Sequence, residues 1–257
     1  MSARSALVLS AAVCILLAAA GLTGCARSRV SPTPRLQEVP TPVLLPLAED
    51  VWIHQSWAHV EPWGLVLSQG LVVRSEEGVL LVDTAWNDAD TEALLALVER
   101  TVGARVDAVV VTHAHDDKMG GLRAVQQRGA RTLAHRLTQE DAPGRGLQPA
   151  AETLDDDEVE VFAGVTVFYP GPAHTRDNVI VYHAPSRTLF GGCLVRPGES
   201  QSLGNTADAD VAHWPRAVEA IAERFPEIEH VIPSHGAAGG RGLFEHTRKL
   251  AEGASVR

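Results

Sequence analysis

Residues 108–121 read AVVVTHAHDDKMGG, a short apolar run followed directly by a polar, histidine-rich segment. The run from Ala108 to Val111 predicts a strand that is buried on both faces. His113, His115 and Asp117 follow at intervals of two residues, so a loop that enters a helix can direct all three side chains into one small volume. Imidazole and carboxylate groups together suit zinc. The segment therefore predicts a metal site, although a solvated polar turn could carry the same residues.

Short β-like runs and amphipathic helical patterns alternate along the chain from about Val43 onward. The expected strands are Val51–His54, Leu65–Ser68, Leu71–Arg74, Val79–Asp83, Ala108–Val111, Thr132–Ala134, Val159–Phe162, Val165–Tyr169, Val179–His183, Thr188–Phe190 and His230–Pro233, with turns at Gly70 and Gly78. The expected helices are Asp88–Val102, a segment near Met119–Arg128, Val211–Arg224 and a last helix from Gly242. This order predicts an α/β fold, a sheet-rich sandwich with helices outside and functional loops at the strand ends.

Composition and charge restrict the possible partners. The 257 residues are 45% hydrophobic and 21% charged, which is typical of a globular protein with a full core. The formal net charge is −10, so we expect no nucleic-acid partner and no polybasic membrane-binding surface. Because the whole chain has only three cysteines, no disulfide framework is expected. We expect a monomer.

The N-terminus has the pattern of an export signal. Arg4 precedes an almost unbroken apolar run over residues 7–21, and LTGC at 22–25 resembles the lipobox of bacterial lipoproteins, in which the chain is cut before the cysteine and Cys25 is acylated. An ordinary secretory leader with a chance cysteine is the alternative. Because Ala26 and not an aspartate follows, we expect a periplasmic protein anchored by lipid to the outer membrane. The expected organisation is a lipoprotein signal peptide over 1–24, a lipid-anchored flexible tether over 25–43 and the folded domain over 44–257.

Three further candidate metal ligands each follow a predicted strand and lie beside small residues. They are His174 in GPAHTRDN, Cys193 in GGC and His235 in PSHG. Cys193 could be a buried apolar thiol, but a free thiol in an exported protein risks oxidation, and a zinc-bound thiolate explains it better. The other histidines, including His54, lack such a context, and we expect them to be structural or exposed.

These motifs, in this order, resemble the metallo-β-lactamases of subclass B1, and among them most nearly the New Delhi type. The resemblance extends from about Val51 to the C-terminus through VDTAW (82–86), THAHDDKMGG (112–121), FYPGP (168–172), GGCLV (191–195), SLGN (202–205) and DAD (208–210). It implies the four-layer αβ/βα sandwich of that family. Hydrolases resembling glyoxalase II have a histidine where this chain has Lys118, whose ammonium is a poor ligand; Cys193 would supply the missing donor.

The resemblance also implies a site for two zinc ions. It assigns His113, His115 and His174 to the first zinc, and Asp117, Cys193 and His235 to the second. A zinc-activated hydroxide would open the β-lactam ring of penicillins, cephalosporins and carbapenems, and so confer antibiotic resistance.

The same resemblance implies roles for residues around the metals. Asn205 would stabilise the developing oxyanion, and Asp117 would orient the water that protonates the departing nitrogen. Arg196, where relatives commonly have lysine, would bind the substrate carboxylate. Trp63, in a mobile flap expected over 56–70, and Trp86 would contact the substrate.

Two other functions stay open. One is a different hydrolase of the same fold, such as a thioesterase or lactonase, and the other is a non-catalytic lipoprotein that buffers zinc. A zinc buffer has no need of Arg196, Asn205 or a flap, so the sequence favours the β-lactam hydrolase. Asp83 is expected to orient the metal-binding loop from outside the ligand set.

Overall fold

The computed structural model describes residues 38–255, which lie in one compact unit. The expected signal peptide over 1–24, the acylated Cys25 and the tether up to residue 37 lie outside the described residues. Within the described part, no helix is both long enough and apolar enough to cross a membrane.

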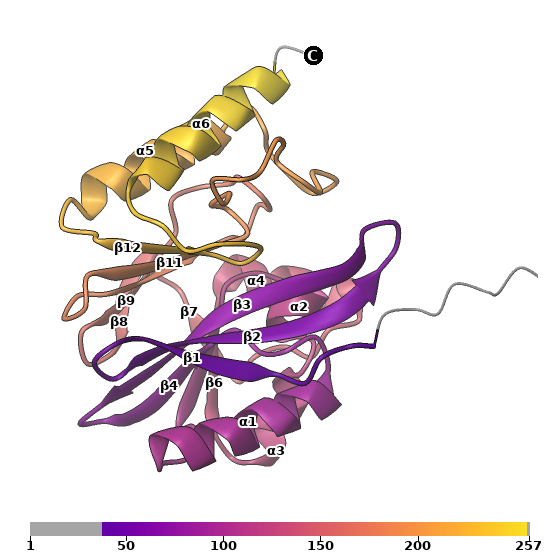
Figure 1. The fold of residues 1–257 in the computed structure, drawn as a ribbon, viewed down its shortest axis with the longest axis vertical. Coiled ribbons are helices and arrows are strands. Elements are labelled where there is room, and N and C mark those ends of the chain that lie inside the picture. Colours follow the sequence, from indigo (N-terminus) through magenta and orange to yellow (C-terminus); the bar gives the residue numbers. More distant parts are fainter. Residues whose placement is uncertain (1–37, 256–257) are drawn as a thin grey trace, which may run out of the picture. The chain divides into compact units, whose positions relative to one another are not determined.

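Two β-sheets form the centre of the molecule (Figure 1). The first contains, in spatial order, β1 (Val43–Ala48), β2 (Val51–Val60), β3 (Gly64–Ser75), β4 (Gly78–Val82), β5 (Ala108–Val111), β6 (Arg131–His135) and β7 (Glu152–Leu154). Its pairs are antiparallel from β1 to β4 and parallel from β4 to β7. The second contains β12 (His230–Pro233), β11 (Thr188–Gly192), β10 (Ile180–His183), β9 (Val165–Phe168) and β8 (Glu158–Phe162), and only β11 and β12 are parallel.

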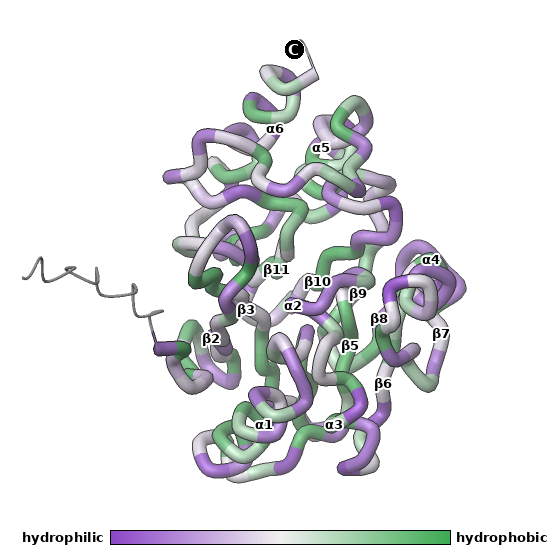
Figure 2. Tube along the Cα trace, turned by 90° about the vertical axis from the view of Figure 1, so that its right-hand side faces the viewer, coloured by the Kyte–Doolittle hydropathy of each residue, from purple (hydrophilic) through white to green (hydrophobic). Residues whose placement is uncertain are grey.

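Helices cover the outer face of each sheet. The first sheet carries α1 (Asp88–Val102), α2 (Asp116–Met119), α3 (Leu122–Gln127), α4 (Arg136–Asp141) and the short 3₁₀ helix η1 (Pro143–Arg145); the second carries α5 (Trp214–Arg224) and α6 (Gly242–Ser255). Three buried apolar clusters separate the four layers: one between the sheets, one under α1 and α3, and one under α5 and α6. Figure 2 shows the strongly hydrophobic segments along interior strands such as β5 and β10. The predicted four-layer αβ/βα sandwich is confirmed.

Helix α1 illustrates how local sequence defines an element. The side chain of Asn87 accepts a hydrogen bond from the Asp90 amide and caps the first turn. Gly103, at φ 78°, ends the helix in the left-handed conformation. The buried face includes Leu94 and Val98, so this helix has the bounds that the sequence predicts.

Two expectations were wrong in detail. Gly70 lies inside the continuous strand β3 and not in a turn, and glycine occurs there because a Cβ would lie 2.1 Å from His54 Nε2. The flap expected over 56–70 takes the form of a paired β2–β3 hairpin whose turn carries Trp63, and its mobility stays a prediction. The helix expected near 119–128 is divided into α2 and α3, because Gly121 packs so closely on Thr91 that a Cβ would lie 1.8 Å from its Oγ1.

The ligand-bearing loops follow four strands drawn from both sheets. His113 follows β5, His174 follows β9, Cys193 follows β11 and His235 follows β12. The carboxyl ends of these strands therefore deliver side chains from distant parts of the sequence to one place.

Candidate metal centre

The six predicted ligands lie in three overlapping groups whose donor atoms are within 4.8 Å of one another: His113, His174 and Cys193; His113, His115 and Asp117; and Asp117, Cys193 and His235. The first ligand group below is the three histidines His113, His115 and His174, and the second ligand group is Asp117, Cys193 and His235. In the first group, His115 Nδ1 lies 3.1 Å from His113 Nε2 and 3.3 Å from His174 Nε2. The three imidazole rings meet edge to face, with centroids 4.7–5.2 Å apart. The ring nitrogens of His113 and His174 therefore both lie close to Nδ1 of His115.

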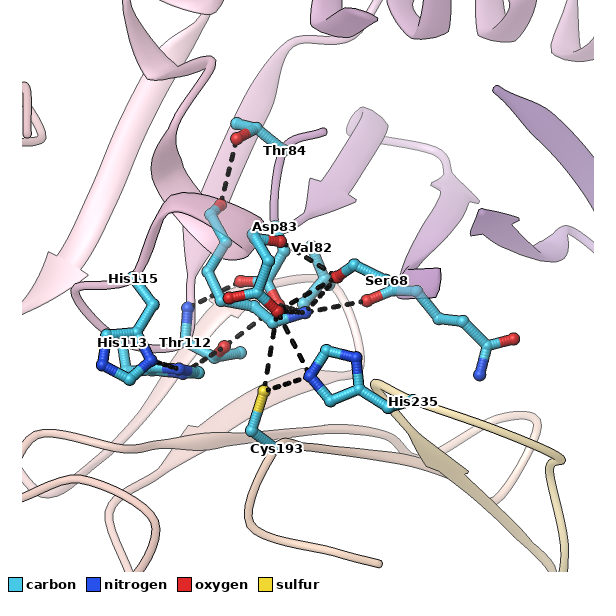
Figure 3. Close-up of polar contacts among 12 residues, drawn as sticks. Ser68, Val82, Asp83, Thr84, Thr112, His113, His115, Cys193 and His235 are labelled. Atoms are coloured by element: carbon cyan, nitrogen blue, oxygen red, sulfur yellow. Dashed lines mark hydrogen bonds and ion pairs between the residues drawn. The ribbon is translucent and has the colours of Figure 1, made fainter. Parts of the chain in front are cut away.

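The second group combines a carboxylate, a thiol and an imidazole. Cys193 Sγ lies 3.3 Å from His235 Nε2 and 3.7 Å from Asp117 Oδ2, and these last two atoms are 3.5 Å apart. In Figure 3 the side chains of Cys193 and His235 point toward one another. Cys193 is buried and reduced.

Both groups have the dimensions of a zinc site. Zn–N bonds of about 2.0–2.1 Å and Zn–S bonds of about 2.3 Å place the donors of a tetrahedral site about 3.3–3.6 Å apart. The observed donor separations run from 3.1 to 3.7 Å. These separations match those between the ligands of one metal ion, so the arrangement fits metal ions. Thiolate, imidazole and carboxylate together favour zinc.

Outer hydrogen bonds define which nitrogen of His235 and of His115 is free to bind metal. His235 Nδ1 donates to the carbonyl oxygen of Leu67 over 2.6 Å, which leaves the lone pair on Nε2. His115 Nε2 donates to Asp208 Oδ2 over 3.0 Å, which leaves the lone pair on Nδ1. In both residues the free nitrogen is the one that faces the other ligands.

Asp83 holds the loop that carries His113, as expected. Its carboxylate accepts the Thr112 amide over 2.8 Å and the Thr112 hydroxyl over 3.0 Å (Figure 3). The same hydroxyl lies 3.3 Å from His113 Nδ1. Asp83 is completely buried and belongs to none of the ligand groups, so it orients the ligand through Thr112.

Lys118 lies beneath the second group. Its ammonium is fully buried and donates to the Ser68 hydroxyl over 2.7 Å and to the Gln69 carbonyl over 3.2 Å, and it lies 3.1 Å from Asp117 Oδ2. Burial alone would raise the pKa of Asp117, but the Lys118 ammonium and the nearby imidazoles hold it well below its ordinary value. Asp117 is therefore an anionic ligand.

The metal groups open into a cavity of about 550 Å³. The predicted substrate-binding residues Trp63, Trp86, Arg196 and Asn205 all line it. Trp63 is 58% exposed at the tip of the β2–β3 hairpin, which projects from the body of the domain in Figure 1.

Arg196 and Asn205 have hydrogen-bond donors that no described residue occupies. The guanidinium of Arg196 contacts the Ser200 hydroxyl over 3.3 Å, its Nε has no partner among the described residues, and it forms no ion pair there. Asn205 Oδ1 accepts the Ala207 amide over 3.1 Å, and this bond leaves the two Nδ2 hydrogens of the side-chain amide as donors.

Several supporting residues were missed by the sequence analysis. They are Ser68, Thr112, Arg145 and Asp208. Thr112 and Asp208 lie within motifs that were recognised, so proximity to the ligands was an available signal for both. Nothing in the local sequence of Ser68 or Arg145 marks them, because their partners lie 49 and 63 residues away.

Comparisons with known proteins agree with this geometry. The model of the metallo-beta-lactamase superfamily matches residues 63–236. The "Metallo-beta-lactamase type 2" of Bacillus cereus is 37% identical over 206 residues, which are 79% of this chain and 80% of that protein. The crystal structure of the metallo-beta-lactamase FIM-1 from Pseudomonas aeruginosa, in its mono-zinc form, is 45% identical with a TM-score of 0.81 and covers 85% of this chain and 98% of its own. A metallo-beta-lactamase from Hirschia baltica is 39% identical with a TM-score of 0.80, over 82% and 98% of the two chains.

The two-sheet sandwich, with its two ligand groups at the strand ends, defines a zinc-dependent hydrolase. The chain belongs to the metallo-β-lactamase family and is similar to its B1 members. The expected fold and enzyme class are therefore confirmed. The finer resemblance to the New Delhi type stays a prediction from the sequence motifs.

Proposed function

We propose that this protein hydrolyses the β-lactam ring of penicillins, cephalosporins and carbapenems with two zinc ions, and so confers resistance to these antibiotics. The observation that carries the proposal is the convergence of both ligand groups on one cavity that also contains Arg196 and Asn205. The similar FIM-1 structure is a mono-zinc form, so the second ion rests on the Asp117, Cys193 and His235 group of this chain.

His113, His115 and His174 would hold the first zinc, and Asp117, Cys193 and His235 the second. Bound zinc supplies a hydroxide at neutral pH and polarises the carbonyl that is attacked. The chain has to present the substrate to that centre, stabilise the charge that develops and provide a proton for the departing nitrogen.

Arg196 is placed to bind the carboxylate common to β-lactams. Burial lowers the pKa of Arg196, and Cys193 and Glu199 offset only part of that effect, so a substrate anion would stabilise the charged guanidinium. A carboxylate can receive two parallel N–H bonds from the planar guanidinium, which a lysine cannot provide. Arg196 therefore fixes one end of the substrate.

Asn205 and Asp117 act at the reacting bond. The Nδ2 group of Asn205, oriented by the bond from Ala207 to its Oδ1, donates to the oxygen that gains negative charge. Asp117 Oδ2 is occupied by Ser68, Lys118 and the second ligand group, whereas Oδ1 has no partner among the described residues. We place the orientation of the proton-donating water on Oδ1.

Trp63 and Trp86 provide the apolar surface of the cavity. Aromatic rings at the mouth cover apolar parts of a substrate and exclude water from them. This arrangement, together with Arg196 and Asn205, supports hydrolysis over the zinc-buffer alternative. Cys193 in the second ligand group, and Lys118 beneath that group, favour a β-lactamase over a thioesterase or lactonase.

We propose a location as well, on the N-terminal sequence alone. The LTGC pattern at 22–25 supports acylation of Cys25 and attachment to the outer membrane, with the folded domain acting as a monomer in the periplasm.

The test of the function is hydrolysis by the purified protein of benzylpenicillin, a cephalosporin and a carbapenem. We expect turnover of all three, loss of turnover with a zinc chelator, recovery on adding zinc, and no inhibition by clavulanate. Metal analysis should give two zinc ions per chain. Turnover that survives removal of zinc would contradict the mechanism, and a faster reaction with a simple thioester or lactone would favour the other hydrolase.

A further inference from the structure

We infer that Arg145 is a positioning residue of this site, acting through Asp208 on both His115 and the segment that carries Asn205. The inference rests on the proposed function for its kinetic consequences, but the contacts that support it are independent of any substrate.

One oxygen of the Asp208 carboxylate accepts hydrogen bonds from two residues in other parts of the chain. Asp208 Oδ2 accepts from Arg145 Nη1 over 3.0 Å and from His115 Nε2 over 3.0 Å. Arg145 ends the 3₁₀ helix η1, on the side of the first sheet, whereas Asp208 lies between β11 and α5, on the side of the second. The ion pair therefore connects the two halves of the sandwich beside the cavity.

The connection sets the orientation of His115. Because Asp208 receives the Nε2 hydrogen, Nδ1 keeps its lone pair and faces His113 and His174. Arg145 Nη1 donates to the same oxygen and holds the carboxylate in place beside His115. Among residues 38–255, Arg145 is the only arginine or lysine that pairs with Asp208.

The same carboxylate anchors the segment over residues 199–210. Gly204, at φ +76°, lies so close above Arg196 that a Cβ would be 3.2 Å from its Nη2. Asp210 donates its amide to the Ala173 carbonyl over 2.9 Å. Asn205 therefore directly follows Gly204, which packs against Arg196, and lies three residues before Asp208, which Arg145 holds.

This location predicts a specific kinetic effect. Arg196 should still bind the substrate carboxylate when Arg145 is replaced, so KM should change little. The amide of Asn205 acts on the transition state, so looser anchoring should lower kcat. We expect Arg145→Gln to lower kcat by about five- to tenfold, less than the 10- to 100-fold typical when a partner that touches a metal ligand is removed.

The test compares Arg145→Gln, Arg145→Lys and Asp208→Asn with a matched control, Arg131→Gln. Arg131 also forms an ion pair, with Glu152, but at an exposed place away from the cavity. All variants should unfold near the temperature of the parent. We expect Arg145→Gln to lower kcat while KM for a carbapenem stays within about twofold, Arg145→Lys to recover part of the loss, and Arg131→Gln to match the parent.

A double-mutant cycle decides whether Arg145 acts through Asp208. In the Asp208→Asn background, Arg145→Gln should lower kcat by less than about twofold further. Equal losses in both backgrounds would overturn the inference, as would an equal loss in Arg131→Gln.

A second measurement needs no β-lactam. Hydrogen–deuterium exchange of the zinc-loaded protein should show faster exchange of the backbone amides over 199–210 in Arg145→Gln, and no change in Arg131→Gln. Unchanged exchange would also overturn the inference. If the parent failed to hydrolyse any β-lactam, the proposed function would fail while this exchange experiment would still test the anchor.

Discussion

The ammonium of Lys118 lies 3.1 Å from Asp117 Oδ2, and both groups are buried beneath the second ligand group. The same ammonium lies 3.6 Å from Asp83. Burial would lower the pKa of Lys118, but Asp117, Cys193 and Asp83 together raise it above its ordinary value. One buried cation therefore compensates the anions of the site when no metal is bound.

Lys118→Met removes this charge with little change in side-chain length. We expect the free energy of unfolding to fall by about 3–5 kcal/mol in the chelated protein, the usual cost of leaving a buried charge without its partner. Zinc also neutralises Asp117, so the loss should be smaller in the zinc-loaded protein. Urea unfolding with and without zinc measures both. Lys249→Met, which removes an exposed pair with Glu245 on α6, is the control, and a loss that zinc leaves unchanged would contradict this account.

Cys193→Ser replaces a thiolate by a weak neutral donor in the second group. We expect the second zinc to bind more than about 100-fold more weakly, because even the loss of an outer partner costs 10- to 100-fold. The first zinc should stay in place. Metal analysis after dialysis at low free zinc should therefore fall from two ions to one. The control, Asp116→Asn, removes an exposed acid outside both groups and should keep two; two ions in the serine variant would refute the assignment.

His54 makes stability depend on pH. Its Nε2 donates to the Val82 carbonyl over 2.9 Å, its Nδ1 has no partner among the described residues, and burial lowers its pKa from 6.5 to about 4. The unfolded chain therefore binds the proton more readily between about pH 6.5 and pH 4. Stability contributed by neutral His54 is present above this window and is lost as pH falls through it, by up to about 3 kcal/mol.

His54→Gln keeps a donor for Val82 but cannot titrate. We expect the chelated variant to lose less stability than the chelated parent between pH 7 and pH 4.5, as measured by urea unfolding. His246→Gln, at a partly buried histidine on α6, should behave as the parent. Parallel pH profiles for the parent and His54→Gln would show that His54 is not responsible.

Cys25→Ala tests the proposed anchor separately from the chemistry. If the variant is still exported, we expect a soluble periplasmic enzyme with nearly unchanged kinetics, because the six ligands, Arg196 and Asn205 all lie far along the chain from residue 25. Fractionation of cells should place the parent with the membrane and the variant in the periplasmic fraction. Equal membrane association of the two proteins would exclude the lipid anchor.

Local chemistry explains why much of the fold and the ligand set could be predicted. Asn87 and Gly103 define the start and the end of helix α1 through hydrogen bonds to residues of the same helix, so no distant partner is needed. The apolar run of β5 and the histidines directly after it are likewise neighbours in sequence, so their pattern indicates both a buried strand and a metal-binding loop. Cys193 and His235 each repeat that strand-then-ligand pattern.

Contacts between distant residues account for what the sequence left open. Glycine is a common turn residue, so the sequence suggested a turn at Gly70. The strand β3 runs through this position, and the close approach of the His54 ring explains why the strand has a glycine there. Lys118 could be recognised from the sequence as a poor ligand, but not as a buried counter-ion, because Ser68, its closest partner, lies 50 residues away.

The sequence by itself determined the six candidate ligands and the α/β sandwich, because both depend on residue type and short-range pattern. The division of the ligands between two metal ions and the roles of Trp63, Trp86, Arg196 and Asn205 came from the family resemblance, and Arg145 and Asp208, which also line the cavity, were not found. Only the tertiary structure decided which ring nitrogen of His115 is free and how Asn205 is held. Both depend on Asp208, which meets Arg145 and His115 across 63 and 93 residues of chain. A hydrogen bond of that separation exists only after the two sheets have packed, since packing is what brings its donor and acceptor within 3.0 Å.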